Sequence, residues 1–174
     1  TALLLALTYW PANLLLLSFV ALVPWLRSLR DPNVNVKRSG ATFALLYFSF
    51  QMFWLIVFVE KWTNSVALAA IPYAFTVVAH VPFMILLAFL IKRCYMRGWI
   101  WAIPFAWAGV EFIRATLPFL ALPHALLATP LAAAPNLIQT AAIGTVFLVS
   151  AWVALINVLV VELFERANAR KTIA

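Results

Sequence analysis

The sequence predicts an all-α protein, a polytopic bundle of transmembrane helices with about five full spans and a truncated first span. Two observations lead to this fold class. The 174-residue chain is 67% hydrophobic and 10% charged, with a mean hydropathy of +1.05, whereas about half of a soluble domain is apolar and about a quarter is charged. Its apolar residues also form long continuous runs, unlike the alternating pattern of transmembrane strands.

Each predicted span is an apolar run bounded by polar or basic residues. About 20 residues, at about 1.5 Å each, cross the hydrocarbon core of a bilayer. The first run is too short for this and no basic residues precede it, so we interpret it as the end of a truncated span rather than a signal peptide. Pro72 and Pro82 predict a tilt or kink in the span that contains them. We expect one transmembrane domain over 1–174, with spans near residues 1–9 (partial), 14–29, 40–59, 66–91, 99–117 and 137–161.

The basic residues predict the orientation, because cytoplasmic loops carry an excess of Lys and Arg. Ten of the 12 basic residues lie in the loops 27–38 and 92–97 and in the tail 166–171. Given the predicted spans, all three segments fall on one side, and only Lys61 and Arg114 fall on the other. We therefore expect the three segments to be cytoplasmic. The net charge of +7 then reflects topology, and we expect no nucleic-acid partner.

A charged helical turn lies inside the predicted span 99–117. Glu111 and Arg114 are three residues apart, so their side chains share one face of a helix. A lone carboxylate in lipid costs several kcal/mol. One interpretation is a self-neutralising pair that fixes the rotation and depth of the helix. The other is the wall of a polar cavity open to the outer leaflet, and both interpretations stay open at this point.

The segment after this turn is apolar and yet broken by prolines. No charged residue occurs from 115 to 161. A straight helix is excluded by Pro118, Pro123, Pro130 and Pro135, and bare backbone cannot face lipid. We expect residues 115–136 to lie in the outer interface or to dip back against other spans. There they would contact lipid acyl chains or another domain docked on the membrane.

The stretches PFAWAGVEFIR, LPHALLATPLAAAPNLIQTAAIG and LVSAWVALIN occur in this order. Together they resemble the N-terminal membrane region of bacterial apolipoprotein N-acyltransferases. The stretches WPANLLLLSFVALVPWL and KRSGATFALLYFSFQMFWLIVFVEKW are similar to earlier spans of the same family. Where the family typically has Gly-Phe-Pro-Trp, this chain reads Ala121, Leu122, Pro123 and His124. From this resemblance the candidate structural and cleft residues are Trp54, Trp107, Glu111, Arg114, Pro123, His124 and Gln139.

The resemblance implies a place in the bacterial inner membrane and a ping-pong acyl transfer. In that reaction an acyl group from a phospholipid forms a thioester on the cysteine of a nitrilase-like domain, whose triad is Glu-Lys-Cys. The acyl group then moves to the α-amino group of a diacylglyceryl-cysteine lipoprotein. We expect the chain to be a fragment that lacks this domain, anchors it and helps to form a lipid-facing cleft. The expected partners are membrane phospholipids, the lipoprotein substrate and the nitrilase-like catalytic domain.

No residue of the chain itself is predicted to be catalytic. Cys94, the one cysteine, falls at the cytoplasmic end of a predicted span, on the wrong side for the family's nucleophile. His80 and His124 have no further Cys, His or carboxylate at metal-ligand spacing, so we expect no metal and no cofactor. The alternative function is a non-enzymatic membrane scaffold or a small carrier that shares only hydropathy with the family.

The predicted orientation can be tested by cysteine labelling in intact cells, in a Cys94→Ser background. Single cysteines in place of Asn35 and Arg170 should resist an impermeant thiol reagent, because both positions are predicted to be cytoplasmic. A cysteine in place of Asn64 should react. Labelling at position 35 with protection at position 64 would show that the orientation is inverted.

Overall fold

A computed structural model describes residues 1–9, 12–118, 121 and 123–173, without the side chains of 12, 13 and 168–173. Residues 10 and 11 of the stretch WPANLLLL, Leu122 of the loop and the side chains of Arg170 and Lys171 in the predicted tail lie outside this description. The secondary structure of the described residues is entirely helical, which confirms the all-α prediction. The elements are α1 (Ala2–Leu7), η1 (Ala12–Phe19), α2 (Val23–Arg30), α3 (Val36–Gln51), α4 (Phe53–Thr63), α5 (Val66–Ala79), α6 (Val81–Arg97), η2 (Ile100–Ala102), α7 (Ile103–Thr116), η3 (Thr129–Ala133), η4 (Pro135–Leu137) and α8 (Ala141–Ile173).

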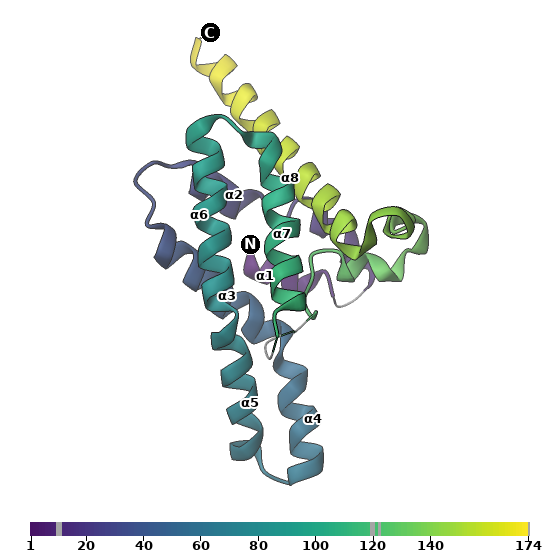
Figure 1. The fold of residues 1–174 in the computed structure, drawn as a ribbon. Coiled ribbons are helices and arrows are strands. Elements are labelled where there is room, and N and C mark those ends of the chain that lie inside the picture. Colours follow the sequence, from purple (N-terminus) through teal and green to yellow (C-terminus); the bar gives the residue numbers. More distant parts are fainter. Residues whose placement is uncertain (10–11, 119–120, 122, 174) are drawn as a thin grey trace.

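The body of the molecule is built from α3, α6, α7 and α8, and the α4–α5 hairpin projects from one end of it (Figure 1). The hairpin points away from the C-terminal end of α8. No residue of α4 is buried, and its apolar side chains, such as Trp62 at 75% exposure, face outward. A largely apolar helix that protein covers only in part is suited to lipid rather than to water.

Fewer helices than predicted are long and apolar enough to cross a membrane. Two stretches of the described chain qualify, Val66–Arg97 and Ala141–Ala167. A third arises if Val36–Gln51 and Phe53–Thr63, which meet at an angle of 47°, form one broken span. The described residues thus support two or three spans, and the count of about five is not confirmed. The predicted span 99–117 contains α7, which has only 14 residues where about 20 are needed.

The predicted span 14–29 is not one continuous helix. It consists of η1, a turn, and α2, whose first turn contains Pro24. Proline fits the first turn of a helix but ends any helix that precedes it. At this break Asn157 of α8 replaces the missing helical bonds. Its Nδ2 donates to the Ser18 carbonyl at 2.7 Å, and its Oδ1 accepts from the Leu22 N–H at 2.9 Å.

The predicted span 66–91 is interrupted at His80, where α5 ends and α6 begins. Pro82 explains this position, because its missing N–H cannot bond back to the previous turn of helix. Pro72, in contrast, lies inside α5. The His80 ring is buried and stacks on Phe48 with 4.0 Å between ring centroids. The interruption is therefore packed against α3 rather than open to lipid.

The basic segments meet at the end of the bundle opposite the α4–α5 hairpin. Lys92 of α6 donates to the carbonyls of Pro32 and Val34 at 2.8 and 2.9 Å. From α2, Arg30 pairs with Glu162 at 2.6 Å and Arg27 pairs with Glu165 at 3.0 Å. Residues 27–38 and 92–97 thus lie beside the C-terminal part of α8. We refer to this end as the basic end; its cytoplasmic location stays a prediction.

The contact between α3 and α6 depends on Gly40. A Cβ at this position would lie 2.7 Å from both the Ile85 Cα and the Met84 carbonyl oxygen. These are backbone atoms of α6, so they cannot move aside as a flexible side chain would. Gly40 therefore sets how closely the two helices approach.

Replacing Gly40 with Ala should force α3 and α6 apart and destabilise the fold by about 1–3 kcal/mol, the usual cost of overpacking. Gly109→Ala in α7 is the matched control, because no atom lies within 4 Å of its added Cβ and alanine favours a helix by about 0.5–1 kcal/mol. Thermal midpoints of the purified variants measure the difference. Equal midpoints would show that the helices are not in the predicted close contact.

Candidate functional site

A short loop between α7 and η3 is held by buried polar side chains of the bundle. It comprises residues 124–128, which we call loop 124–128. Each of its five residues bonds through its backbone to a side chain from another element or from α7. Residues 125–128 are buried although they form no regular helix. Buried backbone outside regular structure requires such partners.

Glu111 holds the loop from α7. Its side chain is 2% exposed, and its Oε1 accepts hydrogen bonds from Trp107 Nε1 at 2.9 Å and from the Leu127 N–H at 2.8 Å. Trp107 lies one helical turn before Glu111, so both side chains point to the same side of α7. The carboxylate thus joins a buried indole to the loop backbone.

Arg114 binds the same loop through its carbonyls. It is 1% exposed, and its Nη1 and Nη2 donate to the carbonyls of His124 at 2.7 Å and Ala125 at 3.4 Å. Its guanidinium also lies over the Phe48 ring, 5.3 Å from the centroid. A cation over an aromatic face is attracted by the ring quadrupole. Arg114 therefore connects the loop both to α7 and to α3.

The pairing of Glu111 with Arg114 stays a prediction. Two ion pairs of the described ranges lie elsewhere, Arg27 with Glu165 and Arg30 with Glu162. Both side chains share one face of α7, as their spacing predicts, but the loop folds back over that face. An N–H group of the loop donates to the Glu111 carboxylate, and two of its carbonyls accept from the Arg114 guanidinium.

Hydroxyl groups from three further elements complete the attachment. Tyr9 OH, just after α1, donates to the Leu126 carbonyl at 3.0 Å, and Tyr47 OH of α3 donates to the Ala125 carbonyl at 3.3 Å. The Ala128 N–H donates to Ser150 Oγ of α8 at 3.2 Å. These bonds also hold Ala125 at φ +54°, a left-handed conformation that costs a non-glycine residue about 1–2 kcal/mol.

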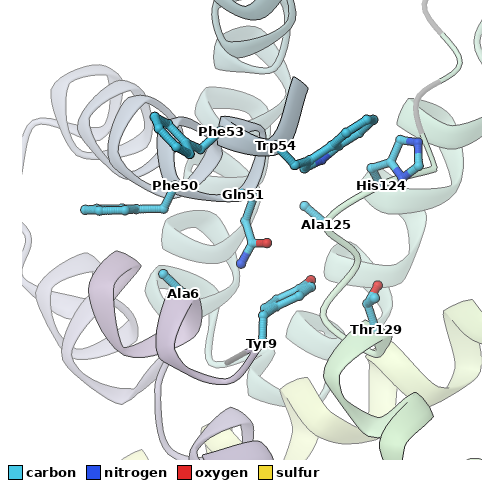
Figure 2. A pocket seen from close by; sticks show the side chains of 9 residues that line it. All are labelled: Ala6, Tyr9, Phe50, Gln51, Phe53, Trp54, His124, Ala125 and Thr129. Atoms are coloured by element: carbon cyan, nitrogen blue, oxygen red, sulfur yellow. The ribbon is translucent and has the colours of Figure 1, made fainter. Parts of the chain in front are cut away.

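A cavity of about 360 Å³ opens beside the loop, next to the base of the α4–α5 hairpin. Trp54 of α4 and His124 lie next to each other on one side of it, in an edge-to-face contact with 5.6 Å between ring centroids and 66° between ring planes (Figure 2). Tyr9 and Thr129 turn their hydroxyls toward the same space, and Gln51 adds an amide (Figure 2). The remaining lining consists of Ala6, Phe50, Phe53 and Ala125.

The structure brings five of the seven predicted residues to one region. Trp54 and His124 line the cavity, while Trp107, Glu111 and Arg114 lie buried behind loop 124–128. The other two lie on the surface. Pro123 is exposed next to His124. Gln139 is exposed and donates to the Pro135 carbonyl at 3.3 Å, and it does not line the cavity.

Sequence reasoning did not include Tyr9, Tyr47 or Ser150 among the candidate site residues. Each carries a hydroxyl inside an apolar run, which is a weak signal because such groups also occur at lipid interfaces and in helix packing. Their common target, the backbone of loop 124–128, is up to 117 positions away in the sequence. Nothing in the sequence marks that backbone as a set of hydrogen-bonding partners.

Comparison of the chain with known proteins identifies its family. The family model for the apolipoprotein N-acyltransferase N-terminal domain matches residues 1–159. The chain belongs to this family. The resemblance inferred from the sequence motifs is thereby confirmed over all but the last residues of the chain. Searches of curated proteins and of solved structures gave no match. As a member of the apolipoprotein N-acyltransferase N-terminal domain family, the chain is a membrane region, in keeping with its long apolar helices.

The role of Glu111 as a hydrogen-bond acceptor can be separated from its role as a charge. Glu111→Ala removes the partner of two buried N–H groups and should lower the stability by about 2–4 kcal/mol. Glu111→Gln keeps an acceptor oxygen and should retain more than half of that stability. Folded yield and thermal midpoint measure both, with Gln139→Ala as an exposed control that should be neutral. A Gln variant as unstable as the Ala variant would show that the negative charge itself is required, as a direct pair with Arg114 demands.

Proposed function

We propose that the chain is the membrane-embedded part of an apolipoprotein N-acyltransferase, and that it anchors the catalytic domain and forms a lipid-facing cleft without catalysing the transfer itself. The family membership supports the first half of this proposal. The observation that carries the second half is the cavity that Trp54 and His124 line together. It lies at the end of the bundle away from the basic end, where the predicted topology places the outer leaflet.

The chemistry of the cavity suits part of a phospholipid. Three aromatic side chains, Phe50, Phe53 and Trp54, provide apolar walls for an acyl chain, while Gln51 and Thr129 offer polar groups for an ester or a headgroup. Ligand pockets commonly have volumes of about 300–1,000 Å³, apolar walls and a few placed polar groups. At about 360 Å³ the cavity holds a portion of a lipid, and the remainder would extend along the exposed apolar hairpin.

The reaction needs groups that lie elsewhere. Acyl transfer through a thioester requires a thiolate nucleophile, a base that accepts its proton, and a cation that stabilises the tetrahedral oxyanion. Cys94 lies near the basic end, in the last turns of α6, remote from the cavity. In this proposal a nitrilase-like domain supplies the triad. Loop 124–128 forms one side of the cavity at which the lipid and this domain come into contact. Both the lipid and the lipoprotein amine then react outside the helices described here.

Replacing Trp54 or His124 with Ala in the complete natural enzyme should lower kcat/KM for acyl transfer about tenfold, because the cavity loses one of the two adjoining rings that line it. Folded yield should stay normal, since Trp54 is 46% exposed and His124 is also exposed. Trp101→Ala is the control, because Trp101 is 62% exposed near the basic end. Acyl transfer is measured with a phospholipid donor and a lipoprotein peptide acceptor.

Two outcomes would contradict the proposal. Equal kcat/KM for all three variants would remove the cavity from the lipid pathway. A complete natural protein that folds and transfers no acyl group from any phospholipid would favour the alternative function, a membrane scaffold or small carrier.

A further inference from the structure

A second concave surface lies at the basic end, between the first turn of α3 and the outer face of α6. It consists of two adjoining cavities of about 750 and about 390 Å³ that share Val36 and Phe89. We call them together the α3–α6 groove. Its half toward the middle of the bundle is apolar, with Pro82, Ile85 and Leu86. Its half toward the end of α6 is lined by Lys92, Arg93, Met96 and Arg97, and Lys37 stands at the rim of the apolar half.

The groove is preformed by the way α3 begins. The Asn35 side chain caps α3 by accepting from the Arg38 N–H at 3.0 Å. The preceding loop is fixed to α6 through Lys92, whose ammonium donates to the carbonyls of Pro32 and Val34. Below this point Gly40 brings the two helices into backbone contact. One wall is thus the start of α3, the other is α6, and both are held in place.

The cations of the groove are not neutralised by the protein. The nearby carboxylates are engaged elsewhere, since Glu162 and Glu165 pair with Arg30 and Arg27 of α2. Asp31 accepts from the Asn33 N–H within its own loop. Among the described residues, Lys37 and Arg93 form no ion pair or hydrogen bond through their side chains. Three of the cationic groups, those of Lys37, Arg93 and Arg97, are exposed, and Arg97 lies over the Trp99 ring, 5.0 Å from its centroid.

We propose that the α3–α6 groove binds one anionic phospholipid of the leaflet at the basic end. Its phosphate would lie among Lys37, Arg93 and Arg97, and one acyl chain would run along α6 from Phe89 to Pro82. Leu86 and Phe89, 41% and 51% exposed, form the apolar bed. A soluble phosphate would leave this bed uncovered, whereas an uncharged lipid would leave three cations unmatched. The site is at the opposite end from the cavity at loop 124–128, so its lipid is a structural ligand.

Native mass spectrometry of the complete natural protein, delipidated and titrated with phosphatidylglycerol, measures the affinity. Lys37→Gln combined with Arg93→Gln should weaken binding about 30-fold, because each basic residue near anionic lipid contributes about a factor of five. Arg38→Gln removes a neighbouring charge that does not line the groove and should change affinity less than threefold. Leu86→Trp keeps every charge but fills the apolar half, and should also weaken binding at least tenfold.

The position of the lipid is tested with phosphatidylglycerol that carries a diazirine on one acyl chain. Photolysis should attach it to the segment 82–89, and an excess of unlabelled phosphatidylglycerol, but not of phosphatidylcholine, should prevent this. Three results would overturn the proposal. These are equal affinity for phosphatidylcholine, equal weakening by Arg38→Gln and the double variant, and a Leu86→Trp variant with unchanged affinity, which would indicate surface attraction without a groove.

Discussion

The attachment of loop 124–128 to the buried side chains of Glu111 and Arg114 is the constraint on which the rest of the structure depends. A carboxylate and a guanidinium buried in an apolar bundle are each costly unless hydrogen bonds satisfy them. Here the loop backbone provides these bonds, with an N–H to Glu111 and two carbonyls to Arg114. The loop also depends on the side chains, because the Leu127 N–H and the carbonyls of His124 and Ala125 are bound by them. The two buried side chains and the loop backbone therefore stabilise each other.

This mutual dependence fixes the relative positions of four parts of the bundle. Tyr9, Tyr47 and Ser150 bring the end of α1, α3 and α8 to the same five loop residues that α7 holds. The position of the loop places His124 in contact with Trp54, and both side chains line the cavity. A few groups held in fixed positions beside an exposed apolar hairpin are the features on which the proposed lipid-binding role rests.

The charged side chains at the two ends of the molecule have different surroundings. At the loop end, Glu111 and Arg114 are buried, and both form hydrogen bonds to the loop backbone. At the basic end, two arginines of α2 pair with the carboxylates of α8, and other cations remain exposed around an apolar groove. Exposed ion pairs contribute about 0–1 kcal/mol each, so the basic end adds little stability. Its excess charge is instead available for the membrane surface.

The sequence by itself determined the class, the family and most of the candidate site. Composition and continuous apolar runs demand helices in a membrane, and ordered motifs around Trp107, Glu111 and Arg114 identify the family. Hydropathy could not determine which runs are single helices. In the span 14–29 the helix is interrupted before Pro24, and Asn157, 135 positions from Leu22, binds the backbone at this interruption. Only the tertiary structure showed that Glu111 and Arg114 both bind the backbone of loop 124–128. Helical spacing shows which side chains share a face, but the backbone that folds over that face is set by packing among distant segments.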